Sequence, residues 1–408
     1  MERLYWNNDW KFAETWEEAM KEAVYPENEM EDVRLPHTCK ELPYHYFDEH
    51  AYQMLCGYRR HFMAPEAWQG KSVELTFEGV AHDAVVYVNG TEVKAHHCGY
   101  TAFFVEIAKY LKYGEDNVLA VRVDSRENLN IPPFGYAIDY MTFGGMYREV
   151  YVQVRNKTHL ADVFVKPQIH PLQVTTEITV QNISDGITLQ QEIRKKGEGA
   201  YSPLGQKPVK QTNVQTVFPV QEICLWEPEN PHLYEIRTSL WKNGEMIDAR
   251  VDITGFREAG FRKDGFYLNG KKLRLRGLNR HQSYPYVGYA APASMQIFDA
   301  DILKRELGVN AVRTSHYPQS QDFIRRCDEI GLLVFTEFPG WQHIGDEEWK
   351  RQAVQNLREM IVQYRNHPSI ILWGVRINES QDDDVFYRET NRVAHELDDT
   401  RATGGVRM

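Results

Sequence analysis

The sequence predicts a multi-domain protein of β plus α/β class, with three domains in series. We expect a jelly-roll β-sandwich at 1–155, an immunoglobulin-like β-sandwich at 156–255, and the first part of a (β/α)8 TIM barrel at 256–408. Three observations carry this prediction. Short alternating runs between turns fill the first part, and similar runs recur at the spacing of a small sandwich in the second. After Phe256, apolar strands alternate with amphipathic helices.

The first domain is predicted from short runs rich in β-branched and aromatic residues. Asn89-Gly90 lies between two of these runs and is a strong signal for a tight hairpin. No helical pattern interrupts the runs, which favours a jelly-roll sandwich. The runs lie at 73–80, 82–93, 117–124 and 147–154.

The second domain shows the same kind of pattern. Asn243-Gly244 marks another hairpin, and the segment 226–231 interrupts the pattern as a Pro-rich loop. The spacing of the runs is typical of a small immunoglobulin-like sandwich. They lie at 163–170, 175–183, 187–194 and 233–256.

The third domain is predicted from alternating strands and helices. A hairpin at Asn269-Gly270 leads into a first strand within 272–281. Nearly continuous apolar strands separated by amphipathic helices are typical of parallel βαβ units. The further strands are expected at 310–318, 332–340, 370–379 and 404–408, with helices at 296–307, 319–330, 346–365 and 384–398.

A complete barrel of this kind takes about 250 residues, whereas 153 residues follow from Phe256 onward. An open half-barrel would expose a sheet edge and apolar helix faces. We therefore expect a truncated barrel that self-associates, as a homo-oligomer or through its open edge, or a natural protein that is longer.

Composition and charge exclude several classes of partner. The 408 residues carry a formal net charge of -11, which argues against nucleic acid because a phosphate backbone demands a basic face. No apolar run reaches the roughly 20 residues that span a bilayer, and the N-terminus lacks a secretion signal. The five scattered cysteines have no CxxC spacing, which predicts free thiols in a reducing compartment. We expect a cytoplasmic protein.

Polar side chains follow four consecutive strands of the predicted barrel. Such barrels place their functional groups at the C-terminal ends of the strands. One such residue alone is weak evidence, but four neighbouring strand ends predict a polar ligand at this rim. The residues are Asn279, Arg280 and His281 after the first strand, Arg313 and His316 on the second, Glu337 on the third, and Asn378 and Glu379 on the fourth.

Two long motifs in this region resemble the family 2 glycoside hydrolases. The first runs from Asn310 to Pro318 and continues through 323–335, and the second runs from Tyr364 to Glu379. Upstream segments at 58–62, 77–80, 88–90 and 97–100 are similar to the sugar-binding domain of the same family. The resemblance covers essentially the whole chain and implies the same order of three domains.

The resemblance implies retaining hydrolysis, in which two carboxyl groups about 5 Å apart act as acid/base and nucleophile. It implies that Glu379 is the acid/base and that Asn378 binds the sugar 2-hydroxyl. An ordinary carboxylate at a strand-to-helix turn is the competing interpretation of Glu379. The family nucleophile lies on strand seven, and only 29 residues follow Glu379, so we expect this chain to lack the nucleophile and to be inactive alone.

Further site residues are implied by the same resemblance. Arg313 matches an arginine that supports the nucleophile, although a structural ion pair competes with that role. His281 and His316 match sugar contacts or structural histidines, and Glu337 either binds substrate or balances Arg313. Asp139 lies in a segment that resembles a family loop carrying an aspartate into the sugar pocket; a turn carboxylate is the alternative. Nearby aromatic residues suit sugar stacking or plain packing: Phe134, Tyr136, Tyr140, Phe143 and Trp341.

No metal or other cofactor is expected. Some family members bind Mg²⁺ through a glutamate and a histidine after strand three. Here His343 matches the histidine, but Trp341 stands where that glutamate would fall. A lone histidine beside Glu379 is a poor site for a hard cation that prefers several oxygen ligands.

The expected substrate is a β-galactoside or related oligosaccharide, because the segments 279–282 and 373–380 are most similar to those of β-galactosidases. β-Glucuronidase and β-mannosidase activities stay open as alternatives within the family. A non-catalytic carbohydrate-binding or assembly protein with a vestigial half-barrel is the alternative from another class.

Overall fold

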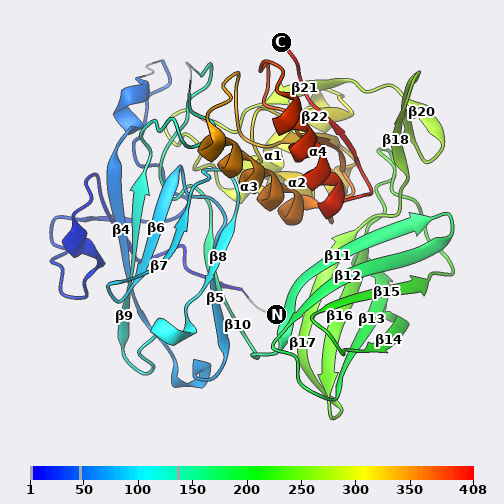
Figure 1. The fold of residues 1–408 in the computed structure, drawn as a ribbon, viewed down its shortest axis with the longest axis horizontal. Helices are drawn as coiled ribbons and strands as arrows, with labels where there is room; N and C mark the ends of the chain where they lie inside the picture. The colour runs from blue at the N-terminus through cyan, green and yellow to red at the C-terminus, as the bar shows by residue number, and fades with distance from the viewer. Residues whose placement is uncertain (1–2, 46–47, 136–137) are drawn as a thin grey trace.

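The computed structural model describes residues 3–45, 48–135 and 138–408. Three units follow one another along the chain: a β-sandwich drawn blue to cyan, a second sandwich drawn green, and an α/β unit drawn yellow to red (Figure 1). The observed order of two sandwiches and a parallel α/β sheet confirms the predicted fold class.

The first sandwich consists of two antiparallel sheets. The larger has the order β3-β2-β4-β9-β6-β7, with strands Glu31–Val33, Trp10–Ala13, Leu55–Met63, Asp116–Asp124, Asp83–Val88 and Thr91–His96. The smaller has the order β1-β10-β5-β8, with strands Leu4–Tyr5, Val150–Arg155, Ser72–Phe77 and Phe103–Glu106. In the described part of this sandwich the helical segments are short 3-10 turns at Glu18–Lys21, Glu49–Tyr52, Glu66–Trp68 and Ala108–Tyr110.

The predicted hairpin of the first sandwich is present between β6 and β7. Asn89 and Gly90 have φ angles of 50° and 82°, so both adopt the left-handed conformation that a type I′ turn requires. Alternate side chains of the strands then point inward, and residues such as Trp10, Tyr58 and Leu75 are fully buried between the two sheets.

The second sandwich also has two antiparallel sheets. One has the order β11-β12-β15, with strands His159–Ile169, Leu172–Gln181 and Asn213–Pro219. The other has the order β14-β13-β16-β17, with strands Ser202–Pro208, Ile187–Lys195, Tyr234–Lys242 and Glu245–Thr254. Asn243 and Gly244, with φ angles of 53° and 82°, close the predicted hairpin between β16 and β17.

Two strands of this sandwich were not predicted, β14 and β15. β14 contains Pro203, Gly205 and Pro208, which disfavour a strand and are tolerated here because β14 is an edge strand. β15 has the alternating pattern that predicts a strand, because Val214 and Thr216 are buried and alternate with exposed residues.

The third unit begins with a small antiparallel sheet and continues as a parallel one. The predicted first strand at 272–281 is split, because its first residues pair within the small sheet and only residues 277–280 begin the parallel sheet. The small sheet β18-β19-β20 comprises Ala259–Arg262, Gly265–Leu268 and Lys271–Leu273. The parallel sheet β21-β22-β23-β24-β25 comprises Gly277–Arg280, Ala311–Thr314, Leu333–Glu337, Ile370–Gly374 and Ala402–Gly404.

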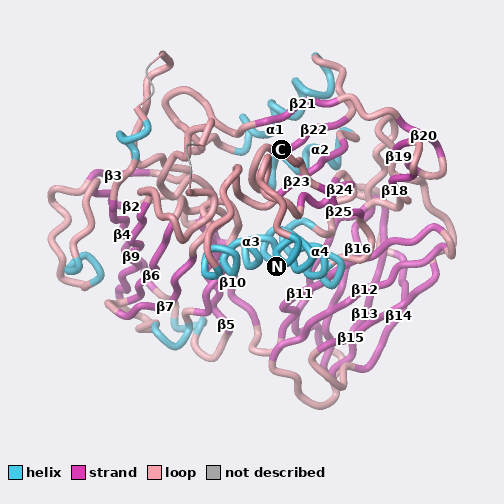
Figure 2. The backbone as a smooth tube through the Cα atoms, turned by 45° about the horizontal axis from the view of Figure 1, so that its top comes forward, coloured by secondary structure: helices cyan, strands magenta, loops and turns pink. Residues whose placement is uncertain are grey.

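Four α-helices connect the parallel strands: α1 Ala293–Asp301, α2 Gln321–Ile330, α3 Glu347–Tyr364 and α4 Asp384–Leu397, with a π-helical turn at Ile302–Glu306 extending α1. The predicted helices match these to within a few residues. Local capping explains the starts of α2, α3 and α4, because the side chains of Ser320, Asp346 and Asp383 each accept a backbone N–H of the first turn. α3 and α4 lie side by side over the sheet (Figure 2).

Buried polar contacts join both sandwiches to the α/β unit. Arg148, which is 4% exposed, donates to Gln282 Oε1 at 3.0 Å and to the carbonyl of Pro318 at 3.1 Å. On the other side, Trp226 of the second sandwich donates its indole N–H to the carbonyl of Asp328 at 2.8 Å. The barrel rim is therefore held in a defined position relative to the first sandwich.

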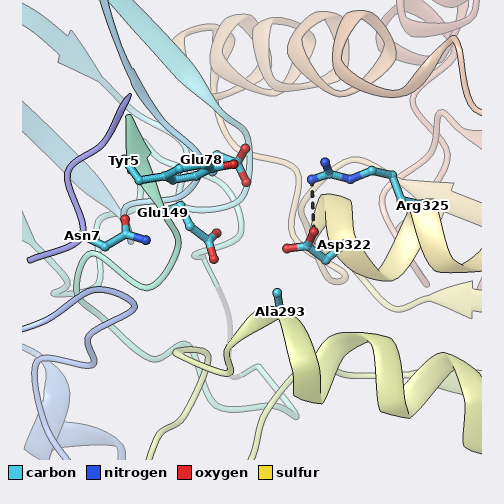
Figure 3. Close-up of a pocket in the computed structure, with 7 residues that line it drawn as sticks. All are labelled: Tyr5, Asn7, Glu78, Glu149, Ala293, Asp322 and Arg325. Carbon is cyan, nitrogen blue, oxygen red and sulfur yellow. Dashed lines mark ion pairs between the residues drawn. The ribbon is translucent and has the colours of Figure 1, made fainter. Parts of the chain in front are cut away.

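A cavity of about 290 Å³ lies where the first sandwich meets α1 and α2. Glu78 and Glu149 line one side, and Asp322 and Arg325 line the other (Figure 3). Glu78 is 3% exposed, and its Oε1 lies 3.4 Å from the Arg3 guanidinium. Burial, reinforced by the negative charge of Glu149, raises the pKa of Glu78 to about 7 despite the Arg3 contact.

All five cysteines are free thiols, four of them buried and Cys224 exposed. Across the ranges that the structure describes, no helix has the length and apolar character needed to cross a membrane.

Candidate active site

The C-terminal ends of β22, β23 and β24 bring four predicted site residues together. The Arg313 guanidinium lies against Glu337, with Nη2 at 2.9 Å from both carboxylate oxygens and Nε at 3.1 Å from Oε2. His316 Nδ1 donates to Glu337 Oε1 at 2.7 Å, and Arg313 Nη2 donates to Asn378 Oδ1 at 2.7 Å. Glu337 is 1% exposed, so its charge is balanced by buried donors.

These contacts fix the orientation of the Asn378 amide. Its oxygen accepts from Arg313, while its Nδ2 is buried and has no hydrogen-bond partner among the described residues. Because a buried unsatisfied donor costs about 1–3 kcal/mol, the amide group suits a ligand that supplies an acceptor. The arrangement matches the sugar-hydroxyl contact expected of Asn378, which stays a prediction.

Glu379 follows directly and is partly exposed at the same rim. Its φ angle of 50° is left-handed, and its backbone N–H donates to the carbonyl of Val406 at 3.0 Å. The side chain accepts a hydrogen bond from Gln342 Nε2 at 3.4 Å. α4 begins five residues later and is capped by Asp383, so Glu379 does not belong to a helix first turn.

His281 lies beside the network in an aromatic cluster. Its Nδ1 is 3.0 Å from the Tyr317 hydroxyl, and its ring centroid is 5.5 Å from that of His316. Burial, and then the nearby His316, lowers the pKa of His281 to about 4. His281 is therefore a neutral imidazole near pH 7, able to donate or accept a hydrogen bond without adding charge.

The first sandwich contributes Tyr140 to this cluster. The Tyr140 ring centroid lies 4.9 Å from that of His281 and 6.0 Å from that of His316. The segment around it is held by the Trp349 indole, which donates to the carbonyl of Phe134 at 3.2 Å, and by Tyr289, which donates to the carbonyl of Met141 at 2.6 Å. The first sandwich thus forms part of the wall of the candidate site.

The other predicted residues lie around this centre. Asp139 is exposed next to Tyr140, with no hydrogen bond or ion pair found for it among the described residues. Trp341 is half-buried and pairs with Asn378 through an isolated parallel bridge. Tyr136 lies outside the described residues. Gly135 approaches the His343 ring so closely that a Cβ would lie 1.9 Å from it.

No group of three or more His, Cys, Asp or Glu side chains that could hold a metal ion occurs among residues 3–45, 48–135 and 138–408. His343 instead contacts the Trp349 ring at a centroid distance of 5.6 Å, and burial lowers its pKa.

Sequence reasoning missed Gln342. A glutamine in a loop carries no signal for a functional role, and its left-handed φ of 59° is uncommon for this residue type. Only the pairing of the 341–343 segment with Asn378 places its amide against Glu379.

Two sandwiches followed by a parallel α/β sheet with carboxylates, histidines and an asparagine at its strand ends form the architecture of a multidomain glycoside hydrolase. Family models agree along the chain: the sugar binding domain of glycosyl hydrolases family 2 matches residues 32–155, the model described as glycosyl hydrolases family 2 matches 158–257, and the family 2 TIM barrel domain matches 260–405. The chain belongs to family 2 of the glycosyl hydrolases.

Curated relatives include two β-galactosidases. The β-galactosidase of Thermoanaerobacter pseudethanolicus is 48% identical over 99% of this chain and 55% of its own length. That of Thermoanaerobacterium thermosulfurigenes is 47% identical over 98% of this chain and 57% of its own length. The chain thus spans about half the length of these relatives.

Solved structures show the same fold. Bacteroides uniformis β-glucuronidase 2, covalently bound to a cyclophellitol-6-carboxylate aziridine, superimposes with a TM-score of 0.89 at 28% identity, covering 99% of this chain and 52% of that one. A putative β-galactosidase from Bacteroides fragilis gives a TM-score of 0.86 at 26% identity, covering 100% of this chain and 63% of that one.

Proposed function

We propose that this chain carries the acid/base half of a retaining β-glycosidase that hydrolyses terminal β-D-galactosides. The observation that carries the proposal is Glu379 at the rim, beside an Asn378 amide that Arg313 holds and whose Nδ2 has no partner in the part of the chain that the structure describes. The β-galactosidase relatives at 48% and 47% identity support the choice of sugar.

Each residue has a distinct role in this proposal. Glu379 protonates the departing glycosidic oxygen and then activates water. Asn378 donates to a sugar hydroxyl, and Arg313 fixes the Asn378 amide. His281 contributes a neutral hydrogen-bonding group, and His316 holds the Glu337 carboxylate in place. Trp341 and Asp139 border the sugar.

The nucleophile is proposed to lie outside these 408 residues. Glu337 is the buried carboxylate of the network and is already paired with Arg313 and His316. Because it is also nearly inaccessible, it is poorly suited to attack an anomeric carbon. Retaining hydrolysis needs a second carboxylate about 5 Å from Glu379. We therefore propose that the 408-residue chain alone is inactive and that a longer protein containing it is active.

A panel of aryl β-glycosides tests this function. The longer protein should hydrolyse the β-galactoside faster than the β-glucuronide or the β-mannoside, and proton NMR of the first product should show the β-anomer. An α-anomer would contradict the retaining mechanism. A preference for the β-glucuronide would favour β-glucuronidase activity. This is the activity named for another relative, a putative β-glucuronidase of Formosa agariphila that is 30% identical to this chain. Sugar binding without hydrolysis of any glycoside would favour a non-catalytic role.

We also propose that the 408-residue chain self-associates along its parallel sheet. β21 is an edge strand, and apolar side chains around it and on α1 are exposed: Leu275 36%, Leu278 48%, Ile297 37% and Phe298 59%. An unpaired edge next to an apolar surface favours pairing with a second chain.

Sedimentation velocity of the 408-residue chain checks this expectation. The sedimentation coefficient should rise with concentration, and Leu278→Lys combined with Phe298→Lys should restore a monomer. Phe104→Lys is the control, because Phe104 is 64% exposed on the edge strand β8 of the first sandwich and should not matter. A monomer at all concentrations in the unmodified chain would refute the proposal.

A further inference from the structure

We propose that Gln342 is a positioning residue for Glu379, holding the acid/base carboxyl through its side-chain amide. This inference rests on the proposed function of Glu379. Gln342 Nε2 donates to Glu379 Oε2 at 3.4 Å, and among the described residues this is the only side-chain hydrogen bond or ion pair of the Glu379 carboxyl.

The backbone holds these two residues face to face. Trp341 and Asn378 form a parallel bridge, and the Gln342 N–H donates to the carbonyl of Asn378 at 2.8 Å. Gln342 and Glu379 are both left-handed, with φ angles of 59° and 50°. Such φ values are uncommon outside glycine and asparagine and persist when the surrounding structure requires them.

The close approach of Gly340 to Ile377 also fixes how these two segments lie against each other. A Cβ at Gly340 would lie 2.4 Å from Ile377 Cδ1, so the loop after β23 packs directly on the segment that leads to Glu379. Because the backbone N–H of Gln342 already makes the turn contact, its side chain is not needed to form the loop. The amide is therefore available for a role of its own.

An amide donor next to a catalytic carboxyl has a positional consequence. It restricts the carboxyl to one orientation, so that the other oxygen can face the departing glycosidic oxygen. The same orientation suits the step in which Glu379 acts as base toward water.

Leaving-group dependence in the longer active protein separates this role from a structural one. Asparagine tolerates the left-handed conformation and is one methylene shorter, so Gln342→Asn should keep the loop and lose the contact. With phenyl β-galactoside, whose leaving group needs a proton, kcat/KM should fall about tenfold. With 2,4-dinitrophenyl β-galactoside, which leaves without protonation, kcat/KM should change less than about twofold.

The pH profile gives a second readout. The basic limb of kcat/KM reports the free enzyme's acid. Gln342→Glu places a second carboxylate beside Glu379 and should move this limb to higher pH, because a like charge disfavours ionisation. The matched control is Gln352→Glu, since Gln352 donates to Glu348 at 3.2 Å on the outer surface of α3, and it should leave the limb in place.

The outcomes decide between the two proposals. Equal losses with both substrates in Gln342→Asn, together with an unmoved basic limb in Gln342→Glu, would overturn the positioning role. Glu379→Gln, measured on the same substrate pair, decides the proposed function separately, because without a selective loss on the phenyl substrate Glu379 itself would not be the acid. An unchanged thermal unfolding midpoint confirms that each variant is folded.

Discussion

Replacing Glu379 by glutamine in the longer active protein is expected to lower kcat/KM for phenyl β-galactoside by roughly 10²- to 10⁴-fold, the usual contribution of a general acid. The amide has the shape of the carboxyl group but cannot supply the proton. The loss should be much smaller for 2,4-dinitrophenyl β-galactoside, whose leaving group departs as a stable anion. Steady-state kinetics on both substrates at several pH values measure this difference.

The structure also indicates a control for this experiment. Glu396 lies on the exposed face of α4, where it pairs with Arg392, and Glu396→Gln should leave both rates unchanged. In Glu379→Gln the basic limb of the pH profile should also disappear, because the group it reports has been removed. A uniform loss on both substrates would contradict the acid/base role of Glu379.

Replacing Glu78 by glutamine should change how stability depends on pH. The pKa of Glu78 is raised from 4.5 to about 7 in the folded protein by burial, so the folded state holds this proton more tightly than the unfolded state. The contribution of Glu78 to the free energy of unfolding is complete below pH 4.5 and is lost as pH rises to about 7. The total loss is roughly 3 kcal/mol. Glu78→Gln stays neutral and should avoid this loss.

Urea unfolding from pH 5 to pH 8 checks this expectation. The free energies of unfolding of the original protein and Glu78→Gln should be similar at pH 5, with the variant more stable at pH 8. Some dependence on pH should remain, since burial also raises the pKa of Glu149 in the same cavity. Glu245→Gln, on the exposed hairpin of the second sandwich, is the control and should parallel the original protein. A lower stability of Glu78→Gln at pH 8 would show that the Arg3 contact outweighs burial.

Much of the fold was predictable because local signals agreed with the final structure. Asn89-Gly90, Asn243-Gly244 and Asn269-Gly270 each close a hairpin with two left-handed residues, a conformation that this dipeptide adopts readily. β14 was not predictable in this way, since its stability comes from pairing with β13 at a sheet edge and not from its own proline- and glycine-containing sequence.

The site was predictable where strand direction determines the geometry. Parallel strands end at one rim, so Arg313, Glu337 and Asn378 had to meet once their strands were recognised. Contributions from loops were harder to predict. Tyr140 was named as a stacking candidate, but its packing against His281 was not predicted, and Gln342 was not named at all. Both contacts join segments distant in sequence, and no local pattern predicts such contacts.

The buried position of Arg148 has a consequence for how the chain is made. Within the first sandwich Arg148 donates to the carbonyls of Glu78 and Tyr100, while its other two acceptors belong to Gln282 and Pro318. Ribosomes add about 5–20 residues per second, so the partners encoded 134 and 170 positions later are made roughly 7 to 34 seconds after Arg148. Until translation has passed Pro318, the nascent sandwich therefore presents a cation that lacks two of its four protein acceptors at the surface on which the barrel assembles.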